Sequence, residues 1–146
     1  MQPEELASSL ELSKKLKELG VRQDGFFHWC EVEFQGKKII KVCSNDLLML
    51  YEERGTPYKV TKLCSAFTFT ETSKWLPLHI SLPHHPEKSY YLCMVRHQSG
   101  RFDLFYLTID NENIFKQTEN MKDADAVGEM LIHLMEQGIV KPENHS

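Results

Sequence analysis

Apolar residues recur at helical spacing near the start of the chain and again near its end. In SLELSKKLKELGVRQ, Leu12, Leu16 and Leu19 share one side of a helix, and lysines and glutamates fill the other side. AVGEMLIHLMEQGIV repeats this arrangement. Ser8 or Ser9 is suited to begin the first helix. Gly20 and Gly138, each followed by an apolar residue, are suited to end the two helices with a left-handed cap. The pattern therefore predicts two amphipathic helices that bracket the chain.

Between these helices the period of the pattern changes to two. GFFHWCEVEFQGKKIIKV alternates between two sets of side chains, and residues 35–36, Gln-Gly, have the composition of a two-residue turn. With that turn, Glu33 lies opposite Lys38 and Val32 lies opposite Ile39. A charge pair and an apolar pair therefore agree on one register, which predicts a β-hairpin.

SYYLCMVRHQSGRFDLFYLTID predicts a second hairpin, with a turn that contains Gly100. Both of its strands are apolar on both faces near their middles. Strands of this kind are typical of a central position in a sheet, or of a sheet that is covered on each side.

Two short helices are expected between the hairpins. In AFTFTETSKWLPL, Thr68 and Glu71 have the spacing of a capping box, and Pro77 helps to end the helix. Residues 44–54, SNDLLMLYEER, are a second helical segment. The least structured stretches are expected at 54–62, 81–88 and 141–146.

Together these elements predict an α+β fold. We expect an antiparallel sheet from two β-hairpins, with N- and C-terminal helices and one or two short inserted helices packed on it. A length of 146 residues suits one hydrophobic core, so a single domain is predicted over residues 1–146. The pattern does not determine the order of the hairpins in the sheet.

Charge and composition exclude several classes of protein. The net charge is −4 and the lysines are dispersed, so general nucleic-acid binding is disfavoured. The first residues, MQPEELASSLELSKK, lack the basic start and apolar run of a secretory signal, and no segment approaches the roughly 20 apolar residues of a membrane span. We therefore expect a cytoplasmic protein without membrane contact. Its four cysteines contain no CxxC pair and are expected to be reduced thiols.

The stretches ELSKKLKELGV, AFTFTETSKWLP and EMLIHLMEQGIV resemble a loose group of small uncharacterised proteins from bacterial prophages and phages. The resemblance covers most of the chain except 43–63 and 81–88. Its shared features are helix caps, aromatic residues and core leucines. It therefore implies a fold and a phage-type origin, but it transfers no catalytic residue, and the group has no assigned activity.

Three histidines lie close together around SLPHHPEK, namely His79, His84 and His85. They are candidate metal ligands, because zinc is held by three or four side chains that converge on one point. The prolines on either side of the adjacent pair favour an extended backbone, in which neighbouring side chains diverge. The resemblance also implies that this loop is variable. We therefore predict no metal site, and no other cofactor is predicted.

No nucleophile stands out from its surroundings. Cys30 and His28 share one side of a strand, but apolar neighbours predict a core pair, whereas a catalytic thiol needs partial exposure and positive charge nearby. Ser99 in HQSGR lacks the glycine pattern of a nucleophile elbow. Asp123 and Asp125 lie where a helix N-terminus favours negative charge. The sequence therefore predicts no catalytic residue and leaves the question of enzyme activity open, leaning towards none.

Aromatic side chains on the predicted strands are the remaining candidates for a binding surface; they are Phe27, Trp29, Tyr90, Tyr91 and Tyr106. The leading hypothesis is a non-enzymatic accessory protein of a phage or prophage that binds a protein partner or itself. One alternative is a single-stranded nucleic-acid binder that stacks bases on these aromatic residues. The other alternative is a small metal- or thiol-dependent enzyme centred on the three histidines or on Cys30.

Overall fold

The computed structural model describes residues 2–53, 55–82, 85–108 and 114–142, with the backbone alone for residues 85 and 86. Its helices are α1 (Pro3–Leu6), α2 (Leu10–Glu18), α3 (Asn45–Glu52), α4 (Phe69–Ser73) and α5 (Asp123–Glu136). Its strands are β1 (Phe27–Phe34), β2 (Lys37–Ser44), β3 (Lys59–Ala66), β4 (His79–Leu82), β5 (His85–Arg96), β6 (Phe102–Thr108) and β7 (Ile114–Asn120).

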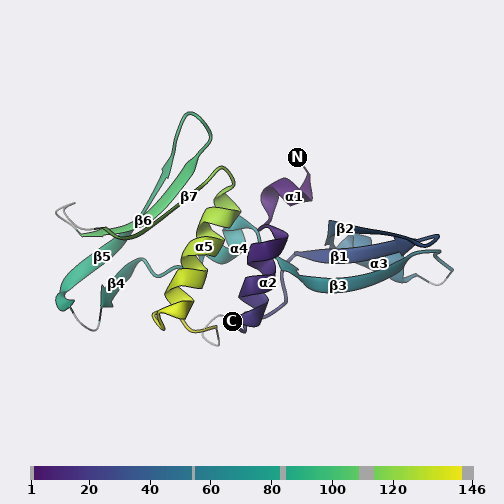
Figure 1. The fold of residues 1–146 in the computed structure, drawn as a ribbon, viewed down its shortest axis with the longest axis horizontal. Helices are drawn as coiled ribbons and strands as arrows, with labels where there is room; N and C mark the ends of the chain where they lie inside the picture. Colours follow the sequence, from purple (N-terminus) through teal and green to yellow (C-terminus); the bar gives the residue numbers. More distant parts are fainter. Residues whose placement is uncertain (1, 54, 83–84, 109–113, 143–146) are drawn as a thin grey trace.

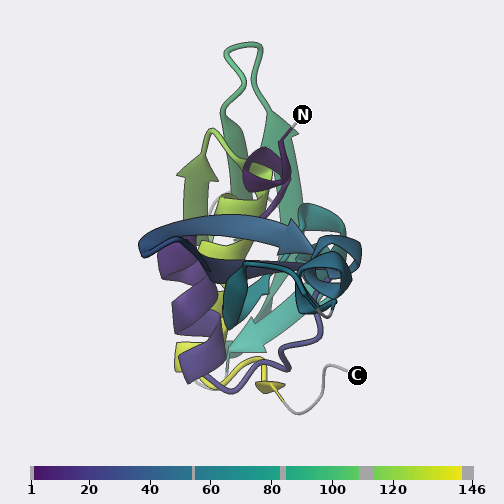
Figure 2. The same ribbon diagram turned by 90° about the vertical axis from the view of Figure 1, so that its right-hand side faces the viewer.

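The strands form two antiparallel sheets with helices between them (Figure 1). One sheet has the order β2-β1-β3 and the other has the order β4-β5-β6-β7. Figure 2, in which the three-stranded sheet is nearest to the viewer, shows α2 and α5 between this sheet and the four-stranded one. The predicted α+β class, with helices near both ends, is confirmed. The two hairpins, however, belong to different sheets, whereas the sequence predicted one sheet for both.

The predicted helix ends are present. The hydroxyl of Ser9 begins α2 by accepting a hydrogen bond from the backbone N–H of Leu12 at 3.4 Å. Gly20 follows the helix with φ of +94°, a conformation that side chains with a Cβ rarely adopt. After α5, Gly138 takes the same role with φ of +74°. Local capping signals in the sequence therefore located both long helices.

Both inserted helices are confirmed as well. The Ser44 hydroxyl caps α3 by accepting from the backbone N–H of Leu47 at 3.2 Å. Thr68 and Glu71 form the complete capping box of α4: each side chain accepts a hydrogen bond from the backbone N–H of the other.

The first hairpin has the predicted register. Glu33 pairs with Lys38, and Val32 pairs with Ile39. The turn residues 35 and 36 have φ of +51° and +78°, the positive values that a tight hairpin turn requires.

Four strands contradict or extend the sequence prediction. β3 begins inside residues 54–62, and β4 and β5 enter residues 81–88, two stretches that were expected to be among the least structured. β7 had not been predicted at all. β3, β4 and β7 are edge strands and carry many polar residues, so they lack a strong alternating pattern. They become ordered by pairing with β1, β5 and β6 rather than through a signal of their own.

The main core lies between the four-stranded sheet and the helices. Met130, Leu131 and Leu134 of α5 are fully buried in it, together with Leu104 and Tyr106 of β6. A smaller cluster lies between the three-stranded sheet and α3; its buried members are Cys30, Val32, Cys43 and Leu48.

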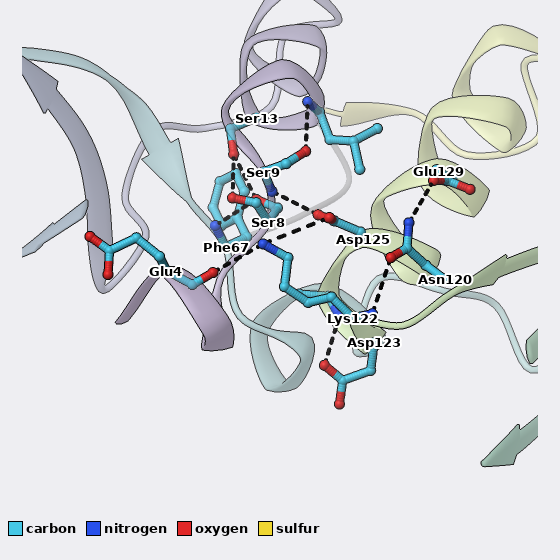
Figure 3. Close-up of polar contacts among 12 residues, drawn as sticks. Glu4, Ser8, Ser9, Ser13, Phe67, Asn120, Lys122, Asp123, Asp125 and Glu129 are labelled. Carbon is cyan, nitrogen blue, oxygen red and sulfur yellow. Dashed lines mark hydrogen bonds and ion pairs between the residues drawn. The ribbon is translucent and has the colours of Figure 1, made fainter. Parts of the chain in front are cut away.

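The segment before α2 joins the two halves of the structure (Figure 3). Ser8 is completely buried, and its N–H donates to the carbonyl of Phe67 at 2.8 Å. Its hydroxyl accepts from the N–H of Phe67 at 3.1 Å and lies 2.7 Å from the hydroxyl of Ser13. Its carbonyl accepts from the indole N–H of Trp29 at 2.9 Å. Ser8 therefore connects β1 and the end of β3 to the first helices.

The neighbouring residues extend this connection to α5. Asp125 accepts from the backbone N–H of Ser9 at 2.7 Å, and the ammonium of Lys122 donates to the carbonyl of Glu4 at 3.0 Å (Figure 3). The carboxylate of Glu4 in turn accepts from the N–H of Val42 in β2 at 3.2 Å. A carboxylate in the first turn of α5 thus serves as a tether as well as complementing the helix dipole.

The change Ser8→Ala is expected to lower the free energy of unfolding by about 1–3 kcal/mol, because it leaves the buried N–H of Phe67 without this partner. Urea denaturation followed by circular dichroism measures the change. Ser99→Ala, at an exposed position, is the matched control and is expected to stay within about 0.5 kcal/mol of the original protein. Equal stability of the two variants would show that the Ser8 hydroxyl carries no such role.

Candidate interaction surface

The four-stranded sheet has one face covered by helices and one face that no described helix covers (Figure 1). We call the second face the outer face. Its centre consists of apolar side chains from the two central strands, which are Tyr91, Cys93, Val95, Phe105 and Leu107. Tyr91 pairs with Leu107, and Cys93 pairs with Phe105, so these side chains form a continuous patch. Tyr91 is 43% exposed and Val95 is 41% exposed.

β5 and β6 take the central positions of their sheet, which is one of the two arrangements that the sequence pattern favoured. Leu104 and Tyr106 of β6 point towards α5 and are fully buried, whereas the residues between them point outwards. On the flanking strands the outer face is mostly polar, with Ser81 on β4 and with Gln117 and Glu119 on β7, whereas Ile114 at the start of β7 pairs with Leu107 and is 54% exposed. The outer face therefore has an apolar centre, which Ile114 extends onto β7, and a border that is otherwise polar.

A charged cluster borders this patch at the β5–β6 turn. The imidazole Nε2 of His97 lies 2.6 Å from Asp103 Oδ2, and the guanidinium Nε of Arg101 lies 3.1 Å from Asp103 Oδ1. Arg101 also lies 3.9 Å from the carboxylate of Glu119. The hydrogen bond from His97 is the largest cause that holds the pKa of the Asp103 carboxyl below its usual value. Sequence analysis missed this cluster. His97, Arg101 and Asp103 flank the predicted turn around Gly100, and this proximity could have indicated that they interact.

The five aromatic candidates do not form one surface. Tyr90 and Tyr106 are buried, and the hydroxyl of Tyr106 donates to the carbonyl of Pro77 at 2.6 Å. Burial raises the pKa of Tyr106. Phe27 and Trp29 are half-buried in the three-stranded sheet. Only Tyr91 lies on the outer face, so the structure brings together no stacking platform from these five residues.

The histidine cluster is only partly described. His79 is exposed on β4, and its ring centroid lies 5.2 Å from that of Tyr91. His84 lies outside the described residues, and His85 is described by its backbone alone. The prediction about these three histidines therefore remains a prediction. Among the described residues, no three histidines, cysteines or acids are grouped so that they could hold a metal ion.

Cys30 lies in the core, as its neighbours in the sequence indicated. It is completely buried, and burial together with the adjacent Cys43 raises its pKa to about 12. The ring of His28 is also buried and lies 2.8 Å from the side-chain oxygen of Asn45. A catalytic thiol needs a lowered pKa and access to substrate, and Cys30 has neither in this arrangement. Ser99 is exposed at the hairpin turn.

Comparison with known proteins gives no match: no family model matches the chain, and neither a curated protein nor a solved structure matches it. The resemblance to phage and prophage proteins therefore rests on the quoted sequence stretches alone. Within the described residues, no helix has the length and apolar character needed to cross a membrane.

A thiol reagent such as Ellman's reagent is expected to modify Cys93 first, because its side chain is only half-buried on the outer face. The other three thiols are buried and are expected to react only after unfolding. Counting the modified thiols at low protein concentration, with Cys93→Ala as the control, measures this order. Fast modification of Cys30 in the folded protein would favour the thiol-enzyme hypothesis.

Stability is expected to fall as the pH drops below 6.5, because burial lowers the pKa of His28 from that value. In this range the unfolded chain binds a proton that the folded chain does not, at a cost of up to about 1.4 kcal/mol per pH unit. His28→Gln should make the fall shallower in the range just below pH 6.5. Urea denaturation at several pH values measures the slope. An unchanged slope would mean that His28 takes up its proton equally in both states.

Proposed function

We propose that this chain is a non-enzymatic accessory protein that acts by associating with a second copy of itself through the outer face. The observation that supports this proposal most is that the outer face has an apolar centre. The two strands that form this centre, β5 and β6, carry apolar side chains on both of their faces. Sheets built from such strands are normally covered on both faces. The described helices cover only one.

Charge favours a second copy as the partner. The charged cluster beside the patch contains His97 and Arg101 against Asp103 and Glu119, and these side chains already interact with one another. This cluster therefore contributes no large excess of either sign that would select an acidic or a basic partner. A two-fold axis is the commonest symmetry of soluble oligomers, and it would place the apolar centre of one copy against that of the other.

The size of the face suits a weak dimer. Four strands about 4.8 Å apart and about 24 Å long give a face of roughly 450 Å², or about 900 Å² for two copies before the height of the side chains is counted. Stable interfaces bury about 1,200–2,000 Å² in total. The association is therefore expected to depend strongly on concentration.

Nucleic acid is a less suitable occupant of this face. Stacking of bases needs exposed aromatic rings beside positive charge, and the outer face offers Tyr91 with the carboxylates of Asp103 and Glu119 near its border. The phage-type origin of the protein rests on the sequence resemblance alone.

Sedimentation equilibrium between about 10 µM and about 1 mM is expected to show a monomer that converts to a dimer as the concentration rises. Val95→Lys should abolish the dimer, because it places a further charge within the apolar patch, where 41% of Val95 is exposed. Ile40→Lys is the matched control: Ile40 is 51% exposed on β2, away from the outer face, and its replacement should leave the dimer intact.

A monomer throughout this range would overturn the proposal, as would equal loss of the dimer in both variants. A bismaleimide cross-linker gives an independent measurement through Cys93 near the centre of the face. Cross-linked dimers should form in the original protein and disappear in Cys93→Ala.

A further inference from the structure

A cleft of about 660 Å³ lies beside β4, at the edge of the four-stranded sheet. Its walls come from the connection between α4 and β4, from β4 itself, and from the chain that follows α5. The lining residues are Lys74, Trp75, Leu76, Pro77, His79, Ile80, Ser81, Ile139, Val140 and Lys141. The volume lies within the range of sites that bind small ligands or short peptide segments.

The cleft runs along the free edge of β4. His79, Ile80 and Ser81 are consecutive residues of the strand, and all three line the cleft. Consecutive side chains of a strand point to opposite faces of its sheet. A cavity that contacts all three residues must therefore pass along the edge of the strand, where the backbone lies.

The backbone of this edge is turned towards the cleft. The N–H of Leu92 in β5 donates to the carbonyl of Leu78 at 3.0 Å, and two residues further on Ile80 pairs with Tyr90. In an antiparallel pair, hydrogen-bonded residues alternate with residues whose N–H and C=O point away from the partner. The N–H and C=O groups of His79 and Ser81 therefore point away from β5, towards the side where another strand would add.

The walls of the cleft suggest the composition of that strand. Ile139, Val140 and Trp75 supply apolar contacts, whereas Lys74 and Lys141 are exposed and positively charged. Among the described residues, no acidic side chain lines the cleft, although the chain as a whole carries a net charge of −4. This part of the surface is therefore locally basic on an acidic protein.

We infer that the cleft beside β4 binds an extended, acidic peptide segment of another protein, which adds to the sheet as a further strand. Backbone hydrogen bonds to His79 and Ser81 hold the segment in register. Alternate apolar side chains contact Trp75 and Val140, and acidic side chains lie near Lys74 and Lys141. This site is separate from the apolar centre of the outer face and does not depend on self-association.

The probe for this site is a fluorescein-labelled hexapeptide of alternating glutamate and valine, and its binding is followed by fluorescence anisotropy. A hexapeptide of alternating lysine and valine is the charge-reversed control. We expect the acidic peptide to bind and the basic peptide to bind at least about tenfold more weakly. Amide chemical shifts in ¹⁵N-labelled protein should change at Ser81 and Lys141 rather than at Cys93 and Phe105 in the centre of the outer face.

Two pairs of variants separate the contributions of backbone and charge. Ser81→Pro removes the N–H that faces the cleft and leaves the hydrogen bonds between β4 and β5 in place, so peptide affinity should fall about tenfold. Ser81→Ala keeps that N–H and should bind as the original protein does. Lys74→Glu with Lys141→Glu should also weaken binding about tenfold, whereas Lys14→Glu on α2 should not.

Circular dichroism and thermal unfolding establish that each variant is folded. Failure of the acidic peptide to bind at about 1 mM would overturn the inference. Equal binding of both peptides would also overturn it, as would equal affinity of Ser81→Pro and Ser81→Ala. Chemical-shift changes confined to the apolar centre of the outer face, at Cys93 and Phe105, would assign the peptide to the proposed dimer surface instead and would equally overturn it.

Discussion

The structure depends on the buried hydrogen bonds of Ser8. Its N–H, carbonyl and hydroxyl all have partners on other parts of the chain, and the residue is completely buried. Buried polar groups are costly when they lose a partner, so each of these bonds restricts the position of the segment. The same segment is bound to α5, because the backbone N–H of Ser9 donates a hydrogen bond to the carboxylate of Asp125. One short stretch therefore fixes the three-stranded sheet relative to the helix that covers the four-stranded one.

This junction also determines which surfaces receive a helix. In the described part of the chain, α2 contacts β3 and α5, and α3 contacts β2 and β3, whereas α5 contacts β6 and β7. The long helices are thus held between the sheets, where both can contribute to the main core. The outer face is left without a helix, although Val95 and Phe105 give it an apolar centre. The same constraint that organises the core therefore leaves one apolar face of the sheet that no described helix covers.

Local signals in the sequence predicted much of the fold. The capping box at Thr68 and the hairpin register at Glu33 involve residues that are close together in the chain, so both could be predicted from the sequence alone. The division into two sheets was not predictable in this way, because it depends on the pairing of β3 with β1, which are far apart in the sequence. Residues such as Lys59 and Lys62 on β3 gave no alternating signal. For the candidate surface, Tyr91 was identified from the sequence, but only the packing of the main core, where Tyr90 contacts Phe115 of β7, shows that Tyr90 is buried.

The edges of the two sheets differ in how they are protected from unwanted pairing. β2 and β3 carry exposed lysines, and β7 carries Lys116 and Glu119, which is a common way to discourage a further strand. β4 is only four residues long, and its free edge lies in a cleft with apolar walls. A short edge strand can pair with only a short peptide segment, and the side chains that line the cleft restrict which segments fit beside it. The length of β4 and the side chains that line the cleft can therefore make this edge selective for the segments it pairs with, whereas charged side chains discourage pairing at the other edges.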